Sequence, residues 1–421
     1  MLLAILATVL VTGFLTIVFL NLQAGEKQIR HKLVHEFAVE DPQFLRSMGN
    51  LLGAGLLPGN QVQGLQNGVQ IFPAMLAAIR SAQVSITFET YIYWSGEIGR
   101  EFSEALSERA RAGVNVHVML DWAGSVKMKT QYLDALKAAG AEVEKFHPLR
   151  WYNLARVNNR THRKLLVIDG RIGFTGGVGI ADQWQGDADS KEHWRDTHYR
   201  MEGPAVAQMQ AAFTDNWIKT RGDVLCGSRY FPALRPAGEA MAQVFKSSRG
   251  EGSESVRLMY LLSITAATRH IRLQSAYFVP DDLAIASFIS ARKRGVKVEL
   301  IVPGPHMDAK LVQNASRALW CELLAAGVKI HEYQPTMYHC KVLIVDDVWV
   351  SVGSTNFDDR SFRLNDETNL NIYDAAFAAE QVHVFENDKR HARVITLEEL
   401  ENRSFLRKTM ETLASLLRRQ L

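Results

Sequence analysis

The chain carries the stretch THRKLLVID at residues 161–169, which is followed by TGG at residues 175–177. A second stretch, YHCKVLIVD at residues 338–346, repeats this pattern and is followed by VGSTN at residues 352–356. Both copies read His, any residue, Lys, four residues, Asp, six residues and then a Gly-Gly or Gly-Ser pair. Two copies in equivalent surroundings predict a duplicated half-site and a reaction that uses two histidines.

The duplication extends well beyond these two motifs. A β-branched and aromatic run at residues 84–92 predicts a strand. A similar run at residues 271–278 follows it at nearly the same separation in sequence as the second motif follows the first. A helical pattern ended by glycine and a further strand follow each run. We therefore predict two homologous α/β units, at residues 61–235 and 236–400, with mostly parallel strands covered by helices.

The first 25 residues contain no charged side chain and are mostly apolar. About 20 such residues in a helix span the hydrocarbon core of a bilayer, so we predict a transmembrane anchor over residues 1–25 and a juxtamembrane connector over residues 26–60. A cleaved signal peptide is the alternative, but no Lys or Arg precedes the apolar run. Lys27, Arg30 and Lys32 follow it, and this bias predicts that the downstream chain lies in the cytoplasm.

The last segment, residues 401–421, is predicted to form an amphipathic helix. Its apolar residues recur on one face, and four basic residues lie elsewhere on the helix. Such a helix can dock on the protein core or lie on an anionic membrane surface. The sequence leaves both alternatives open.

Composition limits the classes of function. The 421 residues are 47% hydrophobic and carry a net charge of +3, which is too small to argue for nucleic-acid binding by itself. The three cysteines, Cys226, Cys321 and Cys340, show neither metal-ligand spacing nor a disulfide framework. This usage fits a reducing compartment.

Each motif opens a short apolar run that predicts a buried strand. Because side chains alternate along a strand, His162 and Lys164 share one face, and His339 and Lys341 share one face with Cys340 opposite. A lysine supplies positive charge for an anion, and a histidine can act as a nucleophile or as an acid and base near neutral pH. Two facing pairs predict phosphoryl transfer in which one histidine attacks phosphorus and the other protonates the leaving alcohol.

Other residues around the motifs are predicted to complete the site. The glycine pairs allow close backbone approach, so Gly177 is expected to bind phosphate together with Ser354 and Asn356. Asp196 is expected to accept a hydrogen bond from His162, and Glu367 one from His339, because each acid follows its motif at a similar separation.

Asp169 and Asp346 end the two predicted strands. We expect them to fix the following turn or to reach the other half of the molecule. A metal site is disfavoured, because a lysine two residues beyond each histidine faces the same way and repels a cation.

The paired motifs resemble those of the phospholipase D superfamily, over about residues 61–400. Within that superfamily the chain is similar to bacterial cardiolipin synthases. The residues that carry the similarity are NNRTHRK at 158–164, FTGG at 174–177, WRDTH at 194–198, YFVP at 277–280 and GSTNFDDRS at 353–361.

This resemblance implies two phospholipase D-like α/β units packed face to face around one active site, with an N-terminal transmembrane helix in the bacterial inner membrane. It implies transfer of a phosphatidyl group between two phosphatidylglycerol molecules through a phosphohistidine, without a metal or other cofactor. By analogy His162 is the nucleophile and His339 the acid and base. The implied catalytic set is His162, Lys164, Asp169, His339, Lys341 and Asp346.

One position departs from the family pattern. The second copy has Asn356 two residues beyond the serine of its Gly-Ser pair, and the first copy has Gly179 there. The first half therefore lacks a hydrogen-bonding side chain, which brings the equivalence of the two halves into question.

Arg156 and Arg160 lie just before the first motif, among aromatic residues. They are predicted to bind lipid headgroups or the membrane surface, which suits phosphatidylglycerol and other anionic phospholipids as partners. A nucleic-acid backbone would also suit such a cluster, but the predicted anchor favours lipid, and we expect no nucleic acid. A solvated basic loop is the structural alternative.

Two alternative functions stay open. A phosphodiesterase of the same chemistry would use water as acceptor and hydrolyse phospholipid or nucleic acid. A catalytically weak membrane protein that binds anionic lipid is the other, and Gly179 is its support. The donor and acceptor lipids, and the oligomeric state, do not follow from the sequence.

Overall fold

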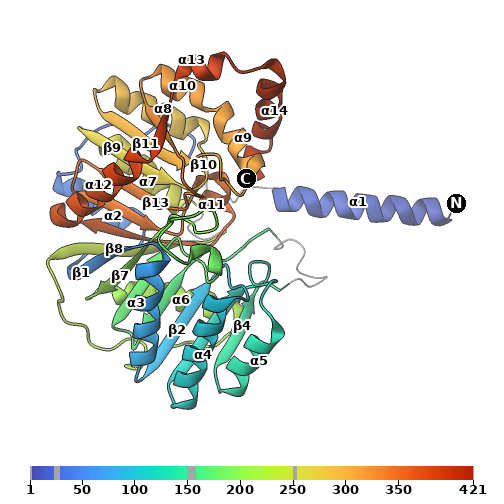
Figure 1. The fold of residues 1–421 in the computed structure, drawn as a ribbon, viewed down its shortest axis with the longest axis vertical. Helices are drawn as coiled ribbons and strands as arrows, with labels where there is room; N and C mark the ends of the chain where they lie inside the picture. Colours follow the sequence, from blue (N-terminus) through green and yellow to red (C-terminus); the bar gives the residue numbers. More distant parts are fainter. Residues whose placement is uncertain (1, 23–28, 149–157, 250–253, 421) are drawn as a thin grey trace.

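The computed structural model describes residues 2–22, 29–148, 158–249 and 254–420. Two α/β repeats form its body (Figure 1). The elements of the first repeat are β1 (Leu57–Gln66), α3 (Asn67–Ser81), β2 (Ser85–Thr90), α4 (Glu97–Arg111), β3 (Asn115–Asp121), α5 (Thr130–Ala138), β4 (Glu142–Phe146), β5 (Leu165–Ile168), β6 (Ile172–Gly176), the 3₁₀ helix η2 (Asp182–Trp184), β7 (Thr197–Glu202) and α6 (Val206–Arg221).

The second repeat follows the same plan with a few additions. Its elements are β8 (Ala240–Ser247), α7 (Ser255–Ala266), β9 (His270–Ser275), β10 (Phe278–Val279), α8 (Asp282–Lys293), β11 (Lys297–Pro303), α9 (Lys310–Ala318), α10 (Trp320–Ala325), β12 (Lys329–Tyr333), β13 (Lys341–Val345), β14 (Trp349–Gly353), β15 (Phe357–Asp358), α11 (Asp359–Arg363), β16 (Glu367–Tyr373), α12 (Ala375–Arg390) and β17 (Ala392–Ile395).

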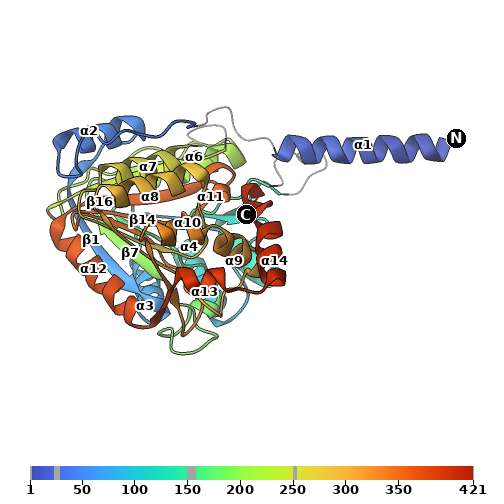
Figure 2. The same ribbon diagram turned by 90° about the horizontal axis from the view of Figure 1, so that it is seen from above.

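The two repeats share one continuous sheet, in the order β17-β12-β11-β9-β13-β14-β16-β8-β1-β7-β6-β5-β2-β3-β4. They join edge to edge, because β1 pairs with β8 at the centre. The expected face-to-face packing of the repeats is therefore corrected. Each repeat begins with a strand that would otherwise present unpaired backbone groups at an edge, and the pairing satisfies them. Helices cover both faces of the sheet (Figure 2).

Only part of the sheet is parallel. The strands β2, β3 and β4 are parallel to one another, as are β9, β11 and β12. The motif strands β5 and β13 instead form antiparallel hairpins with β6 and β14. The expectation of a mostly parallel sheet missed these hairpins, whose tight turns begin at Asp169 and Asp346 with positive φ angles of 53° and 52°.

The Gly/Pro-rich end of the predicted connector belongs to the fold. Pro58 and Gly59 lie in β1, where the pairing with β8 shifts register between Leu57 and Asn60. A proline lacks an N–H group and is tolerated at such an irregularity. The connector also contains α2 (Pro42–Leu51), which Asp41 caps by accepting a hydrogen bond from the backbone of Gln43.

Four hydrophobic clusters lie among the described residues. One lies within the first repeat and two lie mainly in the second. The fourth crosses the seam, where Trp217 and Val167 of the first repeat and Tyr338 and Val342 of the second are buried. A core that crosses the seam holds the two motif strands in a fixed relation, which a shared site requires.

The N-terminal helix α1 (Leu2–Leu22) lies apart from the body in Figures 1 and 2, and its larger apolar side chains from Leu2 to Leu15 are exposed. Among the described residues, no helix reaches the length and hydropathy needed to cross a membrane. The predicted transmembrane anchor is therefore not confirmed.

The C-terminal segment contains α14 (Phe405–Ser415) and the 3₁₀ helix η3 (Arg418–Gln420), and α13 (Leu397–Glu401) precedes it. α14 contacts α9 and buries Glu411 and Ala414. The larger apolar side chains of α14 stay exposed, as do those of the two leucines just after it; they are Phe405, Leu406, Met410, Leu413, Leu416 and Leu417.

Candidate active site

The backbone brings each motif histidine to the opposite repeat. Thr161 pairs with Asp366, and Arg195 pairs with Tyr338, as isolated parallel bridges. The amide of His162 donates to the carbonyl of Asp366 at 2.8 Å, and the amide of His339 donates to the carbonyl of Arg195 at 2.7 Å. The segment before β16 therefore lies against the first motif, and the segment before β7 lies against the second.

This arrangement exchanges the two acids between the repeats. Glu367 lies 3.0 Å from His162 Nδ1 through either carboxylate oxygen, and Asp196 Oδ2 lies 2.7 Å from His339 Nδ1. The predicted pairs, Asp196 with His162 and Glu367 with His339, were wrong. Sequence separation points to the acid of the same repeat, but β7 and β16 start at the seam, where each acid faces the other repeat's histidine.

Both acids are fully buried, and their neighbours favour the ionised form. Burial opposes ionisation of Glu367, yet His162 and Lys164 hold its pKa below the usual range. Burial likewise opposes ionisation of Asp196, and His339 and Lys341 lower its pKa. A carboxylate only accepts hydrogen bonds, so each histidine donates from Nδ1 and keeps a lone pair on Nε2. Nε2 is the atom that can attack phosphorus.

Burial favours the neutral form of both histidines in the free site. Burial lowers the pKa of His162 to about 4, although Glu367 opposes the shift. Burial also lowers the pKa of His339, and Lys341 adds to this effect. A neutral imidazole is the nucleophilic form.

The motif lysines place positive charge beside the histidines. Lys164 Nζ donates to the carbonyl of His162 at 2.8 Å, and Lys341 Nζ lies 3.1 and 3.3 Å from the ring nitrogens of His339. Burial lowers the pKa of Lys164 to about 7 and lowers that of Lys341 as well. A bound anion would favour their charged forms.

His162, Lys164 and His339 line one cavity of about 410 Å³ at the seam. Aromatic rings surround the histidines: Tyr91 packs against His162 with ring centroids 5.2 Å apart, and Trp184 and Trp194 each lie 5.4 Å from His339. The rings limit the space for water, which strengthens electrostatic interactions within the site.

The three predicted phosphate-binding residues have different positions. Asn356 lines the cavity, and its buried Oδ1 has no hydrogen-bond partner among the described residues. The hydroxyl of Ser354 donates to Glu367, and a Cβ on Gly177 would lie 2.2 Å from Asp196 Oδ1. Ser354 and Gly177 therefore contact the acids, and only Asn356 faces the cavity.

Asp169 and Asp346 have structural contacts at the far ends of the motif strands. Asp169 accepts backbone hydrogen bonds from Gln83, Val84 and Ser85, at the start of β2. Asp346 accepts equivalent bonds from residues 268–270, at the start of β9. Neither aspartate lines the cavity. Each aspartate follows the end of its motif strand, β5 or β13, away from the motif histidine. Their implied place in the catalytic set stays a prediction, and their contacts support a structural role.

Trp184 is a site residue that sequence reasoning missed. Its Nε1 donates to Asp196 Oδ2 at 2.9 Å, the same oxygen that contacts His339. A Cβ on Gly179 would lie 2.7 Å from Ile92 and 3.1 Å from the Trp184 ring. The glycine that departs from the family pattern thus makes room for this indole. Gly179 was the sign in the sequence that this position differs from the family pattern. Only the folded position of η2 shows that Trp184 occupies the space.

Of the predicted headgroup residues, Arg160 lines the cavity, and its guanidinium lies 4.9 Å from the centre of the Trp122 ring. Arg156 lies outside the described residues. No group of three or more His, Cys, Asp or Glu side chains in the described part of the chain is arranged to hold a metal ion.

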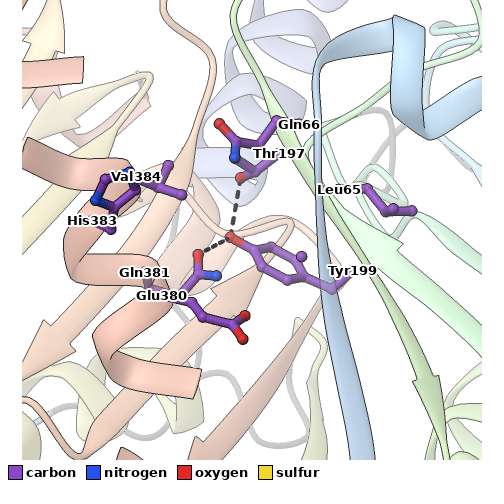
Figure 3. A pocket seen from close by; sticks show the side chains of 9 residues that line it. Leu65, Gln66, Thr197, Tyr199, Glu380, Gln381, His383 and Val384 are labelled. Atoms are coloured by element: carbon purple, nitrogen blue, oxygen red, sulfur yellow. Dashed lines mark hydrogen bonds between the residues drawn. The ribbon is translucent and has the colours of Figure 1, made fainter. Parts of the chain in front are cut away.

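A second cavity of about 300 Å³ lies between β1, β7 and α12 (Figure 3). Tyr199 Oη lies 3.1 Å from Gln381 Oε1 and 3.2 Å from Thr197 Oγ1. Figure 3 draws both hydrogen bonds. This cavity contains neither motif histidine, so we assign the chemistry to the seam cavity.

Comparison with known proteins agrees with this geometry. The family described as "Cardiolipin synthase, PLD-like domain" matches residues 75–217 and 260–389, one match in each repeat. Cardiolipin synthase of Geobacillus kaustophilus is 37% identical over 85% of this chain and 72% of its own length. Cardiolipin synthase A of Pseudomonas putida is 34% identical over 85% of this chain and 74% of its own length.

A solved structure supports the fold. Phosphatidylserine synthase of Haemophilus influenzae superposes with a TM-score of 0.71, covers 90% of this chain and 100% of its own, and is 15% identical. At that identity the likeness concerns the fold alone. The family match over both repeats and the two curated relatives establish that the chain belongs to the cardiolipin synthase family, with two phospholipase D-like domains.

Proposed function

We propose that the protein transfers a phosphatidyl group from one phosphatidylglycerol to a second, which forms cardiolipin and releases glycerol. The observation that carries this proposal is the seam cavity, where two buried histidines lie together and each is paired with an ionised acid of the opposite repeat. The relatives named cardiolipin synthase support the choice of lipid.

In the first step, His162 Nε2 attacks the phosphorus of the donor lipid. The bond from phosphorus to the glycerol oxygen breaks, and His339 gives a proton to that oxygen. The bound phosphate opposes the lowered pKa of His339 and so favours the protonated form that this step needs. Glu367 stabilises the positive charge that develops on His162.

In the second step, His339 takes a proton from the hydroxyl of the acceptor lipid. That oxygen attacks phosphorus, the bond to His162 Nε2 breaks, and both histidines return to their starting states. Lys164 and Lys341 stabilise the negative charge on the phosphoryl oxygens, with Asn356 as a further hydrogen-bond donor. The aromatic rings keep water away from the phosphohistidine.

The lipid substrate places this reaction at a membrane. We propose that residues 1–25 attach the chain to the bacterial inner membrane with the catalytic part in the cytoplasm. The exposed apolar side chains of α1 and α14 support this. Fractionation of cells that express the full chain, followed by protease treatment of vesicles, tests both the attachment and its orientation.

Product analysis tests the reaction. Purified protein with labelled phosphatidylglycerol in mixed micelles is expected to form cardiolipin and glycerol in equal amounts. Phosphatidic acid without cardiolipin would identify a hydrolase instead. Lipid binding without any turnover would identify a catalytically weak lipid-binding protein.

A further inference from the structure

Two arginines line the seam cavity without a role in the chemistry described above. Arg160 and Arg360 come from different repeats, and both are partly exposed to the cavity. Within the part of the chain that the structure describes, neither side chain forms an ion pair with a carboxylate. Two uncompensated guanidinium groups in one cavity indicate an anionic ligand.

Arg160 has the clearest unmet hydrogen-bonding capacity. Its buried Nη1 has no partner among the described residues, and the side chain is held by its contact with the Trp122 ring. Burial lowers the pKa of Arg160, Asp121 and Tyr91 oppose this, and the neighbouring charge of Arg360 adds to it. An anion between the two arginines would relieve both the repulsion and the unsatisfied donor.

Arg360 is held in place by neutral groups. Its Nη1 donates to Asn158 Oδ1 at 3.0 Å and to the carbonyl of Gln420 at 3.3 Å. These contacts fix the side chain at the cavity wall without neutralising its charge. The link to Gln420 also joins it to the C-terminal segment.

The acidic groups nearby are already engaged. Asp121 accepts backbone hydrogen bonds from Ala123, Gly124 and Thr161. Asp308 accepts from the hydroxyl of Tyr277. Burial raises the pKa of Asp358 to about 7, so this carboxyl is partly neutral at physiological pH. Among the described residues, none of these carboxylates is ion-paired with either arginine, so the guanidinium donors stay available to an anion.

Position relative to the reacting histidine identifies the anion. Arg160, His162 and Lys164 alternate along an extended segment and face the cavity, whereas Thr161 and Arg163 are fully buried on the other side. Alternate residues of an extended chain are about 7 Å apart. This spacing suits two phosphates joined by one three-carbon glycerol bridge.

We propose that Arg160 and Arg360 form a second phosphate site that binds the phosphodiester of the acceptor lipid, and so select phosphatidylglycerol over glycerol or water as acceptor. This inference rests on the proposed transfer reaction. The donor phosphate lies between the histidines and lysines, and the acceptor phosphate lies between the arginines. The acceptor's free hydroxyl then lies close to His339.

The test compares three acceptors for the same phosphohistidine. With phosphatidylglycerol as donor, one follows cardiolipin formation, exchange of labelled glycerol into phosphatidylglycerol, and transfer to labelled glycerol phosphate. Glycerol carries no phosphate, and glycerol phosphate carries a phosphate but no acyl chains. The comparison therefore separates recognition of phosphate from recognition of a lipid.

In Arg160→Gln and in Arg360→Gln, the ratio of cardiolipin formation to glycerol exchange is expected to fall about tenfold to a hundredfold, through a higher KM for the acceptor. The preference for glycerol phosphate over glycerol should fall with it. Arg160→Lys keeps the charge and should recover part of the ratio. Arg100→Gln, an exposed arginine on α4 paired with Glu104, is the matched control and should leave the ratio unchanged.

The outcomes separate the two proposals. If both substitutions lower cardiolipin formation and glycerol exchange equally, or leave the ratio intact, the acceptor site is wrong although the enzyme is a synthase. If the unmodified protein exchanges glycerol but forms no cardiolipin, the proposed function fails, and the acceptor site fails with it.

Discussion

The two half-sites hold their histidines with the same backbone contacts and different side chains. His162 is paired with Glu367, which also accepts from the hydroxyl of Ser354. His339 is paired with Asp196, which also accepts from the indole of Trp184. Asp196 also accepts from the backbone amide of Thr197, and Glu367 from the side chain of Asn365. Each acid thus has one histidine and two neutral donors, and Gly179 leaves space for the indole that serves Asp196.

A side chain that one repeat lacks does not remove its function from the site, because another residue can supply the hydrogen bond. The motif comparison suggested that the first repeat is the weaker half, because Gly179 stands where the second repeat has Asn356. In the structure the acid of the first repeat is fully hydrogen-bonded, and the difference lies in the cavity wall. One side offers an amide, and the other offers an aromatic ring.

The largest effect is expected from the histidines themselves. His162→Gln and His339→Gln should each lower transfer at least about 10³-fold, because one removes the nucleophile and the other the acid. Mass spectrometry of protein quenched with substrate separates their roles. His339 serves both steps, so its loss slows formation and breakdown of the adduct alike. Any phosphatidyl adduct trapped in the His339→Gln variant should be on His162, and no adduct should form in the His162→Gln variant. An adduct on His339 would reverse the assignment.

Removal of either acid's charge should have the next largest effect. Glu367→Gln and Asp196→Asn are each expected to lower kcat about 10²- to 10³-fold, because an amide cannot stabilise an imidazolium. NMR of ¹⁵N-labelled histidines checks the exchange between repeats. Glu367→Gln should shift the ring signals of His162 and leave those of His339, and Asp196→Asn should do the converse. Asp223→Asn, exposed beyond α6, is the control.

The neutral donors provide a matched pair with a smaller effect. Trp184→Phe and Ser354→Ala each remove one hydrogen bond to a buried carboxylate, which is worth about 1.5–3 kcal/mol. Each should lower kcat about tenfold with little change in KM, as measured in the cardiolipin assay. A large loss in only one variant would show that the two half-sites depend on their neutral donors unequally.

The lowered pKa of Lys164 predicts that anion binding is coupled to proton uptake. Its pKa of about 7 in the free site means that it loses its proton as pH rises through 7. A bound anion raises that pKa, so anion binding at pH 8 should take up protons. Calorimetry of sulfate binding in buffers with different ionisation enthalpies measures the uptake. Lys164→Met should reduce it, and uptake that survives this change would point to Lys341 instead.

The strand-end aspartates should matter least to the reaction. Asp169→Asn and Asp346→Asn disturb backbone hydrogen bonds at the far ends of β5 and β13. We expect a loss of about 1–2 kcal/mol in the free energy of unfolding. Activity per folded molecule should change less than about twofold. Urea titration and the transfer assay on the same samples check this, and a loss comparable to that of the acid variants would support their place in the catalytic set.

The sequence alone determined the repeat, its α/β class, the two motif strands and the pairing of each histidine with a lysine. These features depend on side-chain alternation and on local patterns, which are properties of neighbouring residues. It also singled out Asp196 and Glu367 as the acids, which follow their motif histidines by 34 and 28 residues.

Only the tertiary structure decided which acid is paired with which histidine. It also decided that Trp184 donates to Asp196 and that Arg160 and Arg360 line one cavity. Each of these contacts crosses the seam between repeats or depends on a segment folding back. The geometry of a seam follows from the pairing of β1 with β8 and from the shared core. Those interactions join residues far apart in the chain, so separation along the sequence carries no information about them.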